Sequence, residues 1–98
     1  MPLFCLHCLD NTVDGAARRA AARPAHLEWA AALGGMVRMA GPLLSPEGQM
    51  VGSVFLIEAA DLAAAMALNA DDPYSKAGVF GQVTIHETRW AIGEGKPQ

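Results

Sequence analysis

The stretch Val51-Gly52-Ser53-Val54-Phe55-Leu56-Ile57-Glu58-Ala59 carries the strongest strand signal in this chain. It combines β-branched and aromatic side chains over the length of a single strand. The turn sequence Ser45-Pro46-Glu47-Gly48 precedes it. Asp61, a residue suited to cap a helix, follows it. The sequence therefore predicts a well-defined strand over residues 51–59, flanked by a turn and a helix.

Working outward from this strand, the pattern predicts a complete small fold. Apolar runs predict three more strands, over residues 3–9, 36–40 and 83–90, and Ala-rich stretches predict helices over residues 16–33 and 61–68. The resulting order is β-α-β-β-α-β. Two split βαβ units of this kind form a four-stranded antiparallel sheet with both helices on one face. We therefore predict an α+β fold, the ferredoxin-like plait.

The first helical stretch contains a proline and has few large apolar residues. Pro24 donates no hydrogen bond to the carbonyl of Ala20, so we expect a kink or a break into two helices. Asp14 is expected to cap its N-terminus. A predicted buried stripe is formed by Ala20, Leu27, Ala30 and Ala31.

Composition predicts an oligomer. The chain has 98 residues, of which 52% are hydrophobic and 17% charged. Such a chain forms one domain, for which we predict residues 1–92, followed by a polar tail over residues 93–98. Its apolar content exceeds what a monomer of this size can cover, so a homodimer is expected. Two sheets packed face to face would give the dimeric α/β-barrel arrangement.

Charge and hydropathy make several classes of partner improbable. The net charge is −3, with no basic cluster beyond Arg18, Arg19 and Arg23, so no nucleic-acid partner is expected. Runs of about 18 apolar residues are lacking, which predicts no membrane span. The start of the chain does not resemble a signal peptide. Together with only two cysteines, this favours a cytoplasmic protein.

Two segments far apart in the sequence hold candidate catalytic residues. His26 follows Arg23 by three positions and Arg19 by seven, so these side chains form one row on a helix. An imidazole beside guanidinium groups can transfer a proton while an arginine holds an anionic substrate. Asp72 precedes Pro73, which directs its backbone into an extended conformation, and its carboxylate could orient a histidine. In the alternative, His26 only fills a half-buried position and Asp-Asp-Pro is an ordinary turn.

The segment Cys5-Leu6-His7-Cys8 has the spacing of a metal-binding motif. On a strand, however, residues three apart point to opposite faces, so Cys5 and Cys8 cannot converge on one ion. Cys5 and His7 share a face, which His86 could join from the fourth strand. We expect no metal site here, and the sequence contains no cofactor-binding motif, so no cofactor is expected.

Five short motifs, taken in order, resemble the YciI (YCII-related) family of small bacterial proteins. They are Arg23-Pro24-Ala25-His26, Gly41-Pro42, Gly52-Ser53, Asp72-Pro73-Tyr74 and Ala77-Gly78-Val79. The resemblance implies that Asp72 pairs with His26 in the site. It also implies that Gly41 and Pro42 shape a pocket wall. Ser53 and Tyr74 are candidate ligand-binding residues, together with Arg19 and Arg23.

The resemblance also implies a class of function. We expect a cofactor-independent acid–base enzyme, a lyase, isomerase or dehydrochlorinase-like protein, with His26 as general acid–base. Its ligand would be a small molecule, aromatic or anionic. One alternative is a non-catalytic small-molecule-binding module of the same fold. Another is a dimeric interaction protein without a pocket, for which no cavity would exist at His26.

Overall fold

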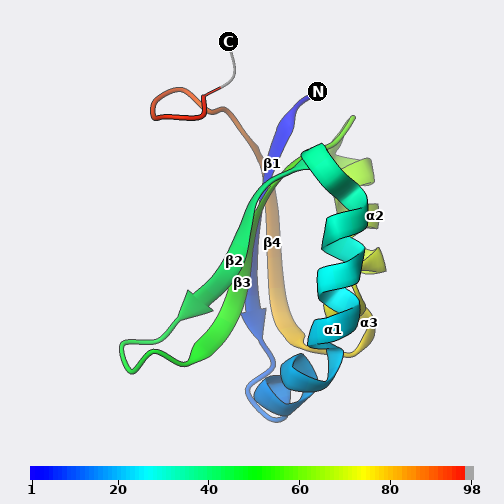
Figure 1. Cartoon of the computed structure of the whole chain (residues 1–98), viewed down its shortest axis with the longest axis vertical. Helices are drawn as coiled ribbons and strands as arrows, with labels where there is room; N and C mark the ends of the chain where they lie inside the picture. Colours follow the sequence, from blue (N-terminus) through cyan, green and yellow to red (C-terminus); the bar gives the residue numbers. More distant parts are fainter. Residues whose placement is uncertain (97–98) are drawn as a thin grey trace.

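The computed structural model describes residues 1–96 and contains one four-stranded sheet with helices on one of its faces (Figure 1). The strands are β1 (Leu3–Asp10), β2 (Val37–Leu44), β3 (Met50–Glu58) and β4 (Phe80–Thr88). The helices are α1 (Gly15–Leu33), α2 (Leu62–Asp71) and α3 (Pro73–Lys76), and a 3₁₀ turn covers Gly34–Met36. The strand order is β2-β3-β1-β4, and every neighbouring pair is antiparallel. The predicted ferredoxin-like plait is confirmed.

The core lies between this sheet and the helices. Phe4 of β1 pairs with Ile57 of β3, and Leu6 pairs with Phe55. All four side chains are buried and face the helices. Because side chains alternate along a strand, the residues between them face the opposite side of the sheet. The central strands therefore bury one face against the helices.

Strand β2 is longer than predicted. It runs through Gly41 and Pro42, where we expected it to end or bend, and reaches Leu44. Proline has no N–H to donate to a neighbouring strand. An interior strand has a neighbour on each side, but β2 is an edge strand with a single neighbour, β3. The edge position therefore explains why Pro42 does not end the strand. Strand β4 starts at Phe80, three residues earlier than predicted, and ends at Thr88.

We expected a kink or a break at Pro24; helix α1 continues through this residue, so a break into two helices is wrong. The helix runs without interruption for 19 residues. Pro24 itself is exposed to solvent. Water can therefore hydrate the Ala20 carbonyl that has lost its N–H partner.

The apolar stripe predicted for α1 is also wrong. Leu27 is 50% exposed, and Ala20 and Ala31 are exposed as well. The buried residues of this helix are Gly15, Arg19 and His26. Arg19 and His26 are seven positions apart, two helical turns, so both project from the same side. Helix α1 thus presents two polar side chains to the interior of the protein.

The two predicted helix caps have different outcomes. The Asp61 side chain accepts a 2.8 Å hydrogen bond from the backbone N–H of Ala64, which caps α2 as predicted. Asp14 makes no such bond with the start of α1. Its carboxylate lies 4.0 Å from the guanidinium of Arg18 instead, so that prediction is wrong.

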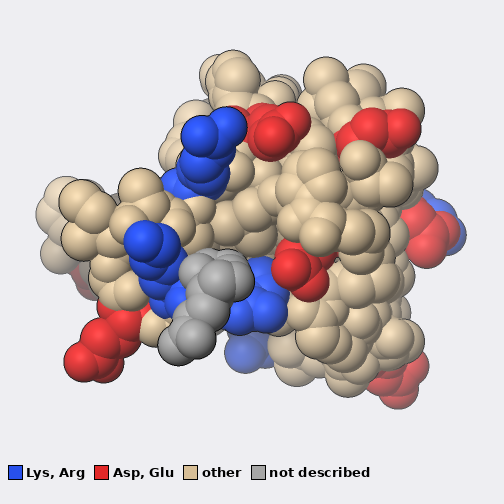
Figure 2. Space-filling view, turned by 90° about the horizontal axis from the view of Figure 1, so that it is seen from above, with Lys and Arg blue, Asp and Glu red and all other residues tan. Residues whose placement is uncertain are grey.

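The surface near the two chain ends has mixed charge. Figure 2 shows acidic and basic side chains interspersed over a mostly uncharged face. Residues 93–96 of the predicted polar tail are exposed, and residues 97–98 lie outside the described part of the chain. Within residues 1–96, no helix is long and apolar enough to cross a membrane.

Candidate active site

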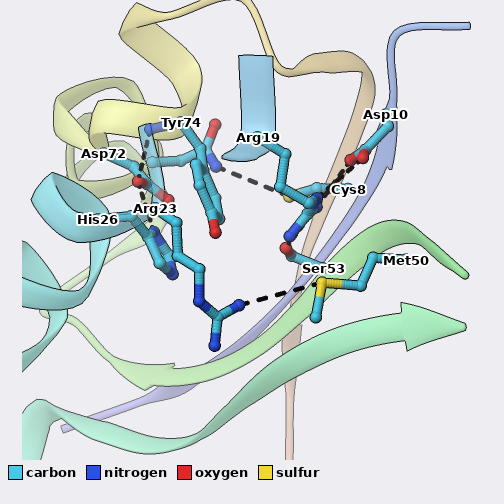
Figure 3. Close-up of polar contacts among 10 residues, drawn as sticks. Cys8, Asp10, Arg19, Arg23, His26, Met50, Ser53, Asp72 and Tyr74 are labelled. Carbon is cyan, nitrogen blue, oxygen red and sulfur yellow. Dashed lines mark hydrogen bonds and ion pairs between the residues drawn. The ribbon is translucent and has the colours of Figure 1, made fainter. Parts of the chain in front are cut away.

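A cavity of about 300 Å³ opens between α1, the β2–β3 pair and α3. Seven of the eight residues predicted for the site line it. Its full lining is Arg19, Arg23, His26, Leu27, Ala30, Ala40, Gly41, Pro42, Ser53, Phe55 and Tyr74. The eighth, Asp72, lies behind His26 and is completely buried. The fold therefore brings the distant motifs of the sequence to one place (Figure 3).

His26 and Asp72 are in direct contact. The Nδ1 atom of His26 lies 2.8 Å from Oδ1 of Asp72, and both side chains are buried. This distance is that of a short, charge-assisted hydrogen bond. His26 comes from the middle of α1 and Asp72 from the junction of α2 and α3, so the contact joins two helices. With Nδ1 occupied, only Nε2 of the imidazole remains for a ligand.

The local sequence around Asp72 fixes its position. Pro73 follows it, and Asp72 has the extended backbone conformation that a following proline imposes, with φ −61° and ψ 127°. Its side chain caps α3, because Oδ1 also accepts a 2.9 Å hydrogen bond from the backbone N–H of Tyr74. The same oxygen thus binds a helix start and the imidazole of His26. This double contact leaves the carboxylate little freedom to rotate.

Tyr74 forms the centre of a stack of three side chains. Its ring lies parallel to the imidazole of His26, with centroids 3.8 Å apart and an angle of 8° between the planes. The guanidinium carbon of Arg19 lies 4.7 Å from the same ring centroid. Figure 3 shows His26 and Arg19 on opposite sides of Tyr74. Stacking of this kind holds the imidazole in one orientation beside the cavity.

Arg19 is bound by residues of the protein itself. Its Nε and Nη2 atoms donate to the two carboxylate oxygens of Asp10, at 2.9 and 2.7 Å, and Nη2 also donates to Oγ of Ser53 at 2.9 Å. Burial alone would lower the pKa of the Arg19 guanidinium, but the hydrogen bonds and charge of Asp10 outweigh it and raise that pKa. Arg19 therefore stays charged, with only Nη1 free of these contacts.

Arg23 differs from Arg19 in its surroundings. Its side chain lines the cavity but is exposed, and Nη1 lies 4.0 Å from the thioether sulfur of Met50. Sulfur of this type is a weak acceptor. Arg19 is therefore held in an ion pair with Asp10, whereas Arg23 is exposed at the cavity.

Several residues near the site carried no functional signal in the sequence. Asp10, which ends β1, is the ion-pair partner of Arg19. Asn69 donates from Nδ2 to the sulfur of Cys8 at 3.8 Å. Burial, assisted by the negative charge of Asp72, raises the pKa of the Cys8 thiol to about 12. Only the position of Asp10 could have been noticed, because an acidic residue there directly follows an apolar strand and precedes the helix that holds Arg19.

The Cys-x-x-Cys segment adopts the strand geometry that separates its cysteines. Cys8 is buried on the helix side of the sheet, and His7 is exposed on the other side. Cys5 pairs across the sheet with His86, on the same side as His7. Cys5 and Cys8 therefore do not point toward a common ion, and neither lines the cavity.

Comparison with known proteins places the chain in a family. The YCII-related domain matches residues 3–89. A solved structure of 5-chloro-2-hydroxyhydroquinone dehydrochlorinase from Burkholderia phenoliruptrix AC1100, in complex with 2,5-dihydroxybenzoquinone, is similar in fold, with a TM-score of 0.81 and 25% sequence identity. The similarity covers 97% of this chain and 99% of that one. The search of curated proteins finds no match. With a domain match over nearly its whole length, the chain belongs to the YCII-related domain family.

Proposed function

We propose that this protein is an acid–base enzyme of the lyase or isomerase type, with His26 as the group that moves a proton. The observation that carries the proposal is the 2.8 Å contact between Nδ1 of His26 and Asp72 at the wall of a cavity. A histidine oriented by a buried carboxylate is a common arrangement for general acid–base catalysis. Such a pair is sufficient for proton transfer, so the proposal requires no cofactor.

The hydrogen bonds of Asp72 define which nitrogen would act as the base. Oδ1 accepts from the backbone N–H of Tyr74. A carboxylate only accepts hydrogen bonds, so the Nδ1 atom of His26 must carry a proton when it binds Asp72. In the neutral imidazole, the lone pair then belongs to Nε2. Asp72 also stabilises the imidazolium that forms when Nε2 takes up a proton.

An elimination is the reaction that fits this pair best. His26 would take a proton from a carbon or hydroxyl of the substrate, and the electron pair left behind would form a new C=C or C=O bond. Chloride would leave with the electrons of its C–Cl bond, so that the net change is loss of HCl. The similarity to a dehydrochlorinase supports this class of reaction. The cavity of about 300 Å³, with Leu27, Ala30 and Pro42 among its apolar walls, favours a small substrate.

The experiment tests chloride release from a panel of chlorinated hydroxyquinols. His26→Gln should lower kcat at least about a hundredfold, the usual minimum contribution of a general acid–base. Asp72→Asn keeps a side chain able to cap α3, but it removes the charge that supports the imidazolium, so kcat should fall while binding changes little. Arg18→Gln is the control, because Arg18 lies on the same helix as His26, pairs with Asp14 and does not line the cavity.

Two results would decide between the acid–base enzyme and the non-catalytic binding module. A His26→Gln variant as active as the control would refute the acid–base proposal. Tight binding of these ring compounds to the native protein without any turnover would instead favour the non-catalytic binding module. An interaction protein lacking a pocket is the weakest candidate, because a cavity is present at His26.

We also propose a homodimer formed through the sheet face opposite the helices. Leu56 and Val54 of β3 point to this face and are only half-buried in the single chain, and Met39 is 45% exposed. Covering these side chains with a second copy would remove apolar surface from water. Light scattering at micromolar concentration should give twice the monomer mass. A Leu56→Lys variant should give the monomer mass, and a stable native monomer would contradict the proposal.

A further inference from the structure

The outer face of the sheet, on the side away from the helices, carries two histidines on neighbouring strands. Figure 1 shows the helices gathered on the other side of the sheet. His7 lies on β1 and His86 on β4. The register pairs His7 with Thr84 and Cys5 with His86, so the two histidines occupy diagonal positions on one face. Diagonal neighbours on antiparallel strands are about 7–8 Å apart.

Water is the main surrounding of both imidazoles in the single chain. His7 and His86 are exposed. Within residues 1–96, no carboxylate lies within ion-pair distance of either of them. A histidine side chain in water takes up a proton near pH 6.5. As the pH falls below that value, the outer face of a single chain therefore gains positive charge that only solvent stabilises.

The neighbours of these histidines are the side chains that the proposed homodimer would cover. Val54 pairs with His7, Leu56 pairs with Cys5, and both are half-buried in the single chain. His7 stands on an interior strand of the sheet, so it lies inside the proposed interface rather than at its rim. The charged side chains near this face gather at one end of the sheet. There a surface pocket contains Arg38, Glu58, Glu87 and Arg89.

A second copy would bring the same groups to this interface. Two sheets packed face to face by a twofold axis would enclose four imidazoles and the two Cys5 thiols. The charged end of each sheet has two arginines beside its two glutamates, so it adds no net negative charge that could balance imidazolium ions. Taking an unpaired imidazolium out of water costs free energy, whereas a neutral imidazole is buried at a much lower cost. Proton uptake by the single chains therefore competes with their association.

We propose that His7 and His86 make the homodimer sensitive to pH, so that it is stable at neutral pH and separates into folded monomers in mild acid. This inference rests on the proposed homodimer and adds its regulation. It is independent of the acid–base role proposed for His26, because that residue belongs to α1 on the opposite side of the sheet.

The test measures the dissociation constant of the dimer at pH 7.5 and at pH 5.5, by analytical ultracentrifugation of a dilution series. At pH 5.5, each imidazole that must release its proton weakens association by about tenfold. Four such groups set an upper limit of about 10⁴, and the dissociation constant should rise by at least about a hundredfold. Circular dichroism should be the same at both pH values, because the separated chains remain folded.

Replacing both histidines should remove the effect of pH. A double variant with His7→Gln and His86→Gln should have nearly the same dissociation constant at both pH values. Glu58→Gln is the control, because it removes a titratable side chain near the same face and should keep the native pH dependence. If the double variant does not associate at pH 7.5, the single variants decide. Each keeps two of the four imidazoles of the dimer and should show a smaller rise in the dissociation constant than the native protein.

A native dimer that is equally tight at both pH values, or tighter at pH 5.5, would overturn the inference and leave the homodimer intact. So would histidine variants with the native pH dependence, or unfolding of the native chain at pH 5.5. The homodimer fails separately. A native protein that is monomeric at pH 7.5 would refute the dimer and this inference with it, whereas the acid–base role of His26 would stand or fall on the turnover of His26→Gln.

Discussion

Replacing Asp10 by alanine should test whether the buried ion pair is essential to the fold. The side chains of Asp10 and Arg19 are only 9% and 6% exposed, and two hydrogen bonds of 2.7 and 2.9 Å join them. Asp10→Ala would leave the Arg19 guanidinium buried, with Ser53 as its remaining partner. Removing one member of a buried pair typically costs about 3–5 kcal/mol. That is a large part of the roughly 5–15 kcal/mol that stabilises a domain.

The assay is urea unfolding followed by circular dichroism, with a thermal scan beside it. A loss of about 3 kcal/mol should lower Tm by at least about 12 °C in a domain of this length. Asp14→Ala is the matched control, because Asp14 also pairs with an arginine, but at 4.0 Å and with a side chain that is 61% exposed. An exposed pair of that kind contributes at most about 1 kcal/mol. Equal losses in the two variants would refute the reasoning.

Two further outcomes follow from the packing around β1 and β3. Burial raises the pKa of the Cys8 thiol to about 12, so at pH 8 it stays protonated and unreactive. A thiol reagent should therefore leave Cys8 unmodified in the native protein and modify it in urea, and rapid labelling of Cys8 in the native protein would contradict this. Gly52→Ala would place a Cβ 2.3 Å from the Cys8 carbonyl oxygen, so unfolding free energy should fall by about 1–3 kcal/mol. Gly41→Ala meets no atom within 4 Å and should change it by less than about 0.5 kcal/mol; a Gly52→Ala protein as stable as Gly41→Ala would disprove the close approach.

The element order was predictable from the sequence because it depends on local patterns. The apolar runs in residues 3–9 and 51–59 identify two strands, and the structure has them paired side by side. The position of Pro42 in an edge strand was not predictable in this way. Whether a proline ends a strand depends on how many neighbours that strand has, and this is a property of the whole sheet.

The polar interior of α1 shows where prediction from local patterns fails. A helix was expected to bury its alanines and Leu27, because apolar residues usually face the core. It buries Arg19 and His26 instead, since Asp10 and Asp72 supply their partners from other segments. Burial of a charged side chain becomes tolerable only when such partners are in place. No periodicity in α1 could reveal residues contributed from outside it.

The double role of the Asp72 carboxylate limits which substitutions this protein can accept during evolution. One oxygen both starts α3 and holds the imidazole of His26, so the geometry proposed for catalysis is assembled as the chain folds. A flexible site must reorient its groups in every turnover. Here the carboxylate and the imidazole are already oriented when the chain has folded. A substitution that removes this oxygen would therefore disturb both the start of α3 and the orientation of His26. Selection for a stable fold and selection for the proposed reaction would therefore both act on Oδ1 of Asp72.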